Sequence, residues 1–399
     1  MALQVSCLAL ALLGGTQMVW AQGDAPVVNA GAAGNPCGQW KHGPLSDPSY
    51  FPIAVWLQSP SNAQRFKDAG INLFIGLWEG PTEEQLVALR EAGMPVICDQ
   101  NAVGLKHLDD PTIVAWMHGD EPDNAQDDGK GGWGPPVLPE KIVADYQRIR
   151  AADPSRPVML NLGQGVAWDG WYGRGVRSRH PEDYAEYMKG GDVISFDIYP
   201  VVHDSPEVKG KLELVPFGVD RLRQWSGDRK LVWNCIECTR ISNANVKPTP
   251  AQVRSEVWMA LIHGSMGLIY FVHQFAPNFI EAGLLADDEM TAGVTALNKQ
   301  IQSLAPLLNS PSLPEAASVV SSVAEVPIDL MVKRHEGATY LFAAAMRDGA
   351  TRGSFEVKGL AGAAKVEVLG ESRTLEARDG KFADEFEGYG VHLYKVAGD

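Results

Sequence analysis

The chain has 399 residues, of which 45% are apolar and 21% charged, ordinary values for a soluble globular protein with a substantial core. This length allows one large domain and a small one. The chain carries 34 Lys and Arg against 49 Asp and Glu, and the resulting net charge of −15 argues against nucleic acid as a partner.

The N-terminus resembles an export signal. The apolar run CLALALLGG is followed by MVWAQGDAP, in which Val19 and Ala21 occupy the −3 and −1 positions of a small-residue cleavage site. We therefore predict a signal peptide over 1–21, an N-terminal extension over 22–47, and a periplasmic or extracellular location. No Lys or Arg precedes Lys41, so a disordered apolar N-terminus of a cytosolic protein is the alternative. No other segment is a long uninterrupted apolar run, and we expect no membrane span in the mature chain.

From Phe51 onward, strand-like and helix-like runs alternate. The predicted strands are 51–58, 71–79, 94–101, 112–121, 157–165, 192–200, 230–237 and 265–275. The predicted helices are 61–70, 81–93, 139–153, 181–190, 214–225, 249–264 and 291–309, and the connection after the third strand is the weakest. The strands are continuous apolar runs, as expected for a parallel sheet that is buried on both faces. Eight such units predict a (β/α)8 barrel over 48–312. A doubly wound open sheet is the alternative, but no glycine-rich phosphate motif follows the first strand.

The pattern of alternating strand-like and helix-like runs ends at about Leu313. Short strand-like runs such as TYLFAAAM and GVHLYKV alternate there with polar turns, which predicts an antiparallel β-sandwich over 313–399. We expect this domain to pack against the barrel, and sugar binding is a weaker possibility for it. Upstream, Cys235 and Cys238 form a lone C-x-x-C without a second pair or a nearby His, which favours buried thiols over a zinc site and leaves a local disulfide open.

Polar residues gather where the predicted strands end, at the face where barrels of this kind build their sites. They include Gln58, Trp78, Glu79, Asp99, Gln100, Asn101, Asp120, Glu121, Asn161, Gln164, Asp197, Tyr199, Glu237, His273 and Gln274. Glu121 ends the fourth strand and Glu237 ends the seventh, so we expect the two to lie roughly opposite each other across the barrel mouth. Two facing carboxyl groups can divide labour, one protonated as acid and one ionised as nucleophile. Glycoside hydrolysis needs such a pair, and a separation of about 5 Å gives the retaining route.

This arrangement resembles that of the clan A (4/7) glycoside hydrolases, (β/α)8 barrels whose acid/base glutamate ends strand four and whose nucleophile glutamate ends strand seven. The resemblance covers roughly residues 48–310, and the C-terminal sandwich resembles the β-domains appended to such enzymes. It implies a retaining glycosidase with Glu121 as acid/base, Glu237 as nucleophile and Tyr199 beside the nucleophile, and it requires no cofactor or metal. The chain departs from the clan at Asp120, where an asparagine usually donates to the sugar 2-hydroxyl and an ionised Asp can only accept.

Two long loops have the composition expected of a sugar-binding surface. They follow strands four and five and carry Trp133, Trp168, Trp171 and Tyr172 among glycines, and flat aromatic faces suit pyranose rings. A basic run that includes Arg174 could hold a uronate or a sulfate. The predicted substrate contacts are Trp78, Glu79, Asp120, Asn161, Gln164, Trp168, Trp171, Arg174, Asp197, Tyr199 and His273.

Two other functions fit the same pattern. One is a carbohydrate-binding barrel that has lost catalysis. The other is a metal-dependent hydrolase that uses His118, Asp120, Glu121 and Asp123 of the segment HGDEPDN. Metal sites need convergent ligands, and residues this close along a strand point to alternate faces.

Overall fold

The structure is a computed structural model that describes residues 40, 42 and 44–397. The predicted signal peptide and most of the predicted extension therefore lie outside the described residues. Among the helices of the described part, none combines the length and the hydropathy that a membrane crossing requires.

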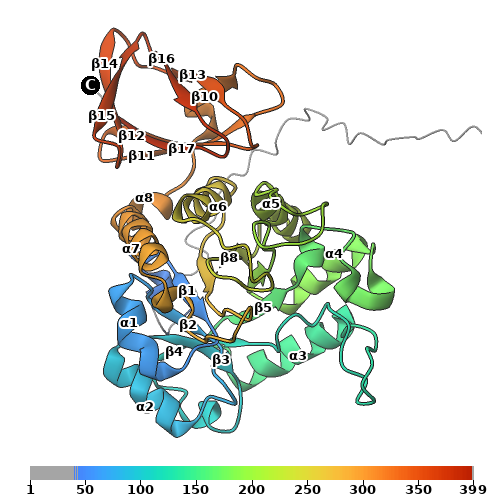
Figure 1. The fold of residues 1–399 in the computed structure, drawn as a ribbon. Coiled ribbons are helices and arrows are strands. Elements are labelled where there is room, and N and C mark those ends of the chain that lie inside the picture. The colour runs from blue at the N-terminus through green and yellow to red at the C-terminus, as the bar shows by residue number, and fades with distance from the viewer. Residues whose placement is uncertain (1–39, 41, 43, 398–399) are drawn as a thin grey trace, which may run out of the picture.

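A closed barrel of parallel strands forms the larger domain (Figure 1). Its strands are β1 (Ile53–Trp56), β2 (Leu73–Ile75), β3 (Val96–Asp99), β4 (Ile113–Met117), β5 (Val158–Leu162), β6 (Val193–Phe196), β7 (Leu231–Val232), β8 (Asn234–Glu237) and β9 (Leu268–Phe271). β7 and β8 are two halves of one strand interrupted at Trp233. Because β7 pairs with β6, β8 with β9 and β9 with β1, the sheet closes on itself as eight strands. The predicted (β/α)8 barrel is confirmed.

Helices cover the outside of the barrel. They are α1 (Ala63–Asp68), α2 (Glu83–Ala92), α3 (Pro139–Ala152), α4 (Tyr184–Tyr187), α5 (Leu214–Ser226), α6 (Pro250–Ile262), α7 (Asp288–Ser303) and α8 (Ala305–Leu308). Short 3₁₀ turns occupy Pro44–Ser46, Pro60–Asn62, Gly104–Lys106, Gln164–Val166, Tyr172–Arg177, Pro181–Asp183, Met188–Gly190, Leu284–Ala286 and Pro314–Ala316. The helix starts follow from local sequence: Thr82 with Gln85, and Thr249 with Gln252, form reciprocal capping boxes. After β3 the chain makes only the turn Gly104–Lys106, in line with the weak helix signal there.

The barrel has two hydrophobic layers. Along β1, Ala54 and Trp56 belong to the cluster inside the barrel, whereas Ile53 and Val55 belong to the larger cluster between the strands and the helices. Both faces of each strand are therefore buried. This burial explains why the strands are continuous apolar runs in the sequence.

The smaller domain is all-β. It contains β10 (Ala317–Ser321), β11 (Ile328–His335), β12 (Ala338–Ala345), β13 (Thr351–Val357), β14 (Ala363–Val368), β15 (Arg373–Arg378), β16 (Lys381–Phe386) and β17 (Val391–Val396). Strands β10, β13 and β16 form one antiparallel layer, and β15, β14, β17, β12 and β11 form the other. The β15–β16 turn joins the layers through one residue pair. Phe355 and Phe382 stack between them at 4.7 Å, so the C-terminal all-β domain is confirmed.

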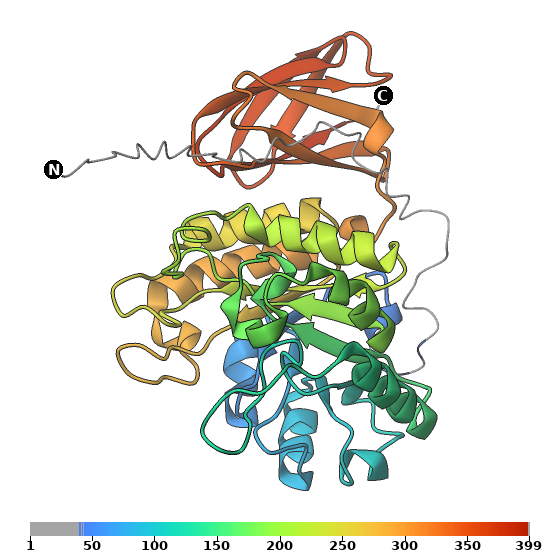
Figure 2. The ribbon, with the colours of Figure 1, turned by 90° about the vertical axis from the view of Figure 1, so that its right-hand side faces the viewer.

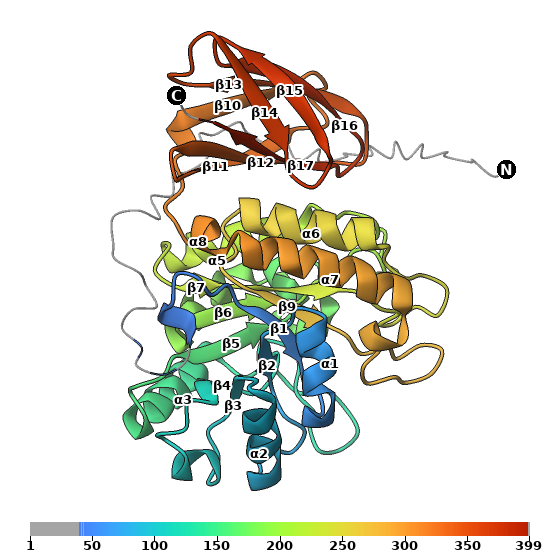
Figure 3. The same ribbon diagram turned by 90° about the vertical axis from the view of Figure 1, so that its left-hand side faces the viewer.

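The β-domain packs on the flank of the barrel, against α6 (Figures 2 and 3). Trp258 of α6 stacks on Phe342 of β12 with ring centroids 5.3 Å apart, and both side chains are fully buried. Arg254 donates to the carbonyl oxygen of Val391 at 2.9 Å. The two domains share one hydrophobic cluster, so the barrel and the sandwich are held together as a unit.

Candidate active site

Three carboxyl groups gather at the ends of β4 and β6. Asp120 and Glu121 follow β4, Asp197 follows β6, and Asn161 of β5 lies between them. The side-chain amide of Asn161 donates one hydrogen bond to Oδ1 of Asp120 and another to Oδ1 of Asp197, both at 2.9 Å. The hydroxyl of Ser195 donates to the oxygen of the same amide at 2.6 Å, which fixes its orientation. A single neutral amide thus bridges two acids.

The backbone brings two consecutive residues into this cluster. In an extended strand the side chains of Asp120 and Glu121 would point to opposite faces. Glu121, however, has a φ of 41°, a left-handed conformation that non-glycine residues rarely adopt. Leu57 and Glu79, which follow β1 and β2, have the same feature. Such strain is concentrated at functional sites, and here it ends the alternation where β4 reaches the mouth.

Burial raises the pKa of all three acids. Burial raises the pKa of Glu121 well above its ordinary value, and the charges of Asp197, Asp120 and Asp123 raise it further. Burial and the charge of Asp197 raise the pKa of Asp120 to about 7, although its side chain reaches solvent.

Asp197 is the acid best supplied with hydrogen-bond donors. Burial raises its pKa, but the Tyr199 hydroxyl, Asn161 and the Cys235 thiol oppose that rise by donating to the carboxylate. The Tyr199 hydroxyl is 2.5 Å from Oδ2. Asp197 is therefore the group most readily held ionised, and Glu121 is the one most readily held protonated.

Glu237 lies elsewhere. It has no exposed surface; its Oε1 accepts from the amide of Val201 at 2.6 Å and its Oε2 from the amide of Val202 at 3.0 Å. Glu256 of α6 lies beside it, and burial raises the pKa of Glu237 to about 7. The structure shows the Glu237 carboxyl bonded to two backbone amides and beside Glu256, and in the described part of the chain no hydrogen bond joins it to Glu121. The role of Glu237 as nucleophile stays a prediction.

The other predicted substrate contacts lie in several places. Tyr199 and Asn161 belong to the acid cluster, and Tyr199 orients Asp197 rather than Glu237. Gln164 contacts His203, with 3.0 Å between its Oε1 and the ring Nε2.

Three predicted substrate contacts, His273, Trp78 and Glu79, lie where β1, β2 and β9 end. His273 is buried there, with its Nε2 3.0 Å from the carbonyl oxygen of Leu57. Trp78 is exposed and donates from its indole to Oε1 of Glu281 at 2.8 Å, and Glu79 next to it is also exposed.

The tryptophans after β5 reach the acid cluster through a residue that sequence reasoning missed. Asn124 donates to Oε2 of Glu121 at 2.6 Å and accepts from the indole of Trp171 at 2.8 Å. Its position three residues after Glu121, in the turn closed by its backbone amide, is a signal that could have pointed to it. Trp168 packs on Trp171 and donates to Glu207 at 2.7 Å, while Trp133 is 79% exposed at a loop tip.

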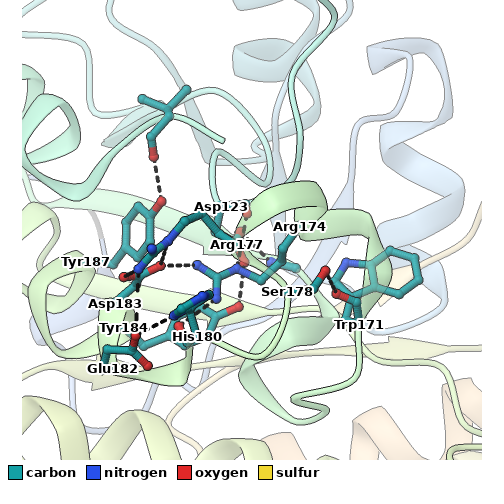
Figure 4. Close-up of polar contacts among 12 residues, drawn as sticks. Asp123, Trp171, Arg174, Arg177, Ser178, His180, Glu182, Asp183, Tyr184 and Tyr187 are labelled. Carbon is teal, nitrogen blue, oxygen red and sulfur yellow. Dashed lines mark hydrogen bonds and ion pairs between the residues drawn. The ribbon is translucent and has the colours of Figure 1, made fainter. Parts of the chain in front are cut away.

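Arg174 is not available to a substrate. It is only 2% exposed and donates to Oδ2 of Asp183 and to the carbonyl oxygen of His180, both at 2.8 Å (Figure 4). Its guanidinium also lies 4.7 Å from the centre of the Tyr184 ring, and Arg177 pairs with the same Asp183. The prediction that Arg174 holds an anionic substrate is therefore corrected: a buried guanidinium needs these partners, and they occupy it.

The remaining sequence features have structural explanations. Cys235 faces the barrel interior and Cys238 the outer layer, so their buried thiols are unpaired. The side chains of HGDEPDN diverge, since His118 contacts the Gly190 carbonyl oxygen and Asp123 accepts from the Gly163 amide. Among the described residues, no three His, Cys, Asp or Glu side chains are grouped to hold a metal ion.

Comparison with known proteins gives the fold. No protein-family model and no curated protein matches the chain by sequence. The solved structure of an α-amylase from Geobacillus thermoleovorans, complexed with acarbose, matches with a TM-score of 0.54 at 12% identity, over 88% of this chain and 99% of that one. The chain has the fold of these barrels. α-Galactosidase I from Mortierella vinacea matches with a TM-score of 0.53 at 10% identity, over 88% and 98%. An Anoxybacillus α-amylase matches with a TM-score of 0.52 at 12% identity, over 88% and 99%.

Proposed function

We propose that this protein is a glycoside hydrolase that acts at the cluster of Glu121, Asp120 and Asp197. One observation carries the proposal: carboxyl groups from β4 and β6 meet at the active-site face of the barrel, where the Asn161 amide bridges Asp120 and Asp197. The likeness of the fold to that of α-amylases and an α-galactosidase supports it. We also propose that the protein is exported, on the basis of its N-terminal sequence.

The proposed mechanism uses Asp197 in the role that the sequence suggested for Glu237. Glu121, held protonated, donates its proton to the glycosidic oxygen as the bond to the anomeric carbon breaks. Asp197, held ionised, attacks that carbon and forms a covalent glycosyl-enzyme. Glu121, now ionised, removes a proton from water, the water oxygen displaces Asp197, and both groups return to their starting states. The anomeric configuration is retained.

The neighbouring residues support these roles. Tyr199 and Asn161 hold Asp197 in position, and each donates to one of its two oxygens. Asp120 is exposed and has one oxygen occupied by Asn161, so the other can accept a hydrogen bond from a sugar hydroxyl. This arrangement also suits the departure from asparagine at position 120. No cofactor is required by this chemistry.

Three variants test the assignment: Asp197→Ala, Glu121→Gln and Glu237→Gln, assayed on a panel of aryl glycosides and oligosaccharides. We expect the rates of Asp197→Ala and Glu121→Gln to fall about 10²–10⁴-fold below that of the wild type. Azide should restore activity to Asp197→Ala by forming a glycosyl azide. Glu237→Gln should keep most of the activity, since the Glu237 carboxyl is buried and bonded to the amides of Val201 and Val202.

Near-normal hydrolysis by Asp197→Ala would refute the mechanism. If azide instead restores activity to Glu237→Ala, the nucleophile is Glu237, as predicted from the sequence. Binding of oligosaccharides by the wild-type protein without turnover would indicate the non-catalytic barrel.

A further inference from the structure

Two groups of exposed or half-buried aromatic rings flank the acid cluster. The first, here called the β5 shelf, consists of Trp168, Trp171 and Tyr172. Trp171 lies 5.9 Å from Trp168 and 4.7 Å from Tyr172, measured between ring centroids, and Tyr172 is 73% exposed. The shelf joins the acid side of the site, because Trp171 shares Asn124 with Glu121.

The second group, here called the β9 shelf, consists of Phe271, Phe275, Phe279 and Trp78. Its rings connect to the other side of the cluster: Tyr199, which bonds to Asp197, lies 5.3 Å from Phe271. Phe275 follows at 6.2 Å from Phe271, and Phe279 at 5.6 Å from Phe275. Phe275 and Phe279 are 53% and 55% exposed.

The positions of the shelves in the barrel place them across its mouth. The strand order around the closed sheet sets β5 opposite β1, and the β9 shelf comes from the segments that follow β2 and β9, the two neighbours of β1. A chain that touches both shelves therefore crosses the acid cluster. Large exposed aromatic surfaces of this kind mark a binding surface.

Most of the charged groups around the mouth are acidic. Three carboxyl groups form the cluster, and Glu207 and Glu281 accept from the indoles of Trp168 and Trp78. Of the nearby cations, Arg174 and Arg177 are both paired with Asp183, whereas Arg240, whose carbonyl oxygen accepts from the Phe275 amide, adds a positive charge beside the β9 shelf. A uronate or sulfate would meet repulsion, whereas the C–H faces of a neutral pyranose suit the electron-rich faces of aromatic rings.

We propose that the substrate is a neutral polysaccharide whose chain lies across the barrel mouth, with sugar rings held on both shelves, and that the protein cleaves it internally. This inference rests on the proposed function and adds to it a substrate class and a mode of attack. The sugars on the leaving-group side occupy the β5 shelf beside Glu121. The sugars on the other side occupy the β9 shelf.

The wild-type protein is tested on soluble starch, galactomannan, xylan and mixed-linkage β-glucan, with polygalacturonate as the anionic comparison. We expect the viscosity of one neutral polymer to fall early, while few reducing ends have been released, and oligosaccharides to appear as products. Release of only mono- or disaccharides from chain ends overturns internal cleavage and leaves the glycosidase function intact. Preference for polygalacturonate overturns the neutral class. If the protein hydrolyses no glycan at all, both proposals fail.

Shelf variants give the second readout. Tyr172→Ala and Phe275→Ala should each raise KM for the polymer about tenfold, the loss of roughly 1.4 kcal/mol of stacking, with a smaller change in kcat. Val320→Ala is the control, since Val320 is 69% exposed and lies on β10 of the C-terminal domain, in neither shelf. An equal loss in this control, or unchanged KM in both shelf variants, overturns the assignment of the shelves.

Discussion

Replacing Asn161 by alanine should move the acid limb of the activity profile to higher pH. The Asn161 amide donates one hydrogen bond of 2.9 Å to Asp197 and another to Asp120. Hydrogen bonds to ionised groups contribute about 1.5–3 kcal/mol each, and one pKa unit corresponds to about 1.4 kcal/mol. Removing the donor disfavours the ionised form of Asp197 and raises its pKa, so the acid limb should move up by about 1–2 pH units. Activity, which needs that form, is then lost at a higher pH.

The assay is kcat/KM as a function of pH, because its acid limb reports the free enzyme's essential base. Ser195→Ala is the matched control: it removes a donor to Asn161 but leaves both bonds to the carboxylates. Its acid limb should move less. An unchanged limb in Asn161→Ala, with the thermal unfolding curve intact, would show that Asp197 is not the group whose ionisation is required.

Three further predictions concern the same framework. Tyr199→Phe should also move the acid limb to higher pH, at least as far as Asn161→Ala does, since the Tyr199 hydroxyl donates a shorter hydrogen bond to Asp197 than the Asn161 amide does. The unfolding free energy should fall as pH rises from 4.5 towards about 7, because burial raises the folded-state pKa of Glu237 and Glu256. In urea titrations at several pH values, Glu256→Gln should show a smaller fall than the wild type. Trp258→Ala should cost about 3–5 kcal/mol of stability in denaturant unfolding, while Val320→Ala, at an exposed site, should cost almost nothing.

The barrel could be predicted from the sequence because the burial of each strand is visible in its own short run of residues. Every residue of a short strand such as β1 is buried, in the interior on one side and under the helices on the other, so the run is apolar throughout. The polar residues that follow each run mark the strand ends. Asn161, Asp197 and Tyr199 were located in this way, and the structure brings all three together.

The direction of a side chain at a strand end could not be predicted, because distant residues decide it. The amides that bind Glu237 come from Val201 and Val202, and the carboxyl beside it comes from α6. Similarly, Arg174 is held by Asp183 in a loop that follows. No pattern within the strand distinguishes a glutamate that faces the mouth from one that turns into the wall.

The stacked pair of Trp258 and Phe342 has a consequence for how this chain can be cut or recombined. Deleting everything after about residue 313 would strip a flat apolar cover from α6 and expose the indole to water. Grafting the barrel onto an unrelated C-terminal domain would do the same unless the graft supplied a ring at the place of Phe342. The sandwich therefore covers part of the barrel's hydrophobic surface, and the barrel cannot be separated from it without exposing that surface to water.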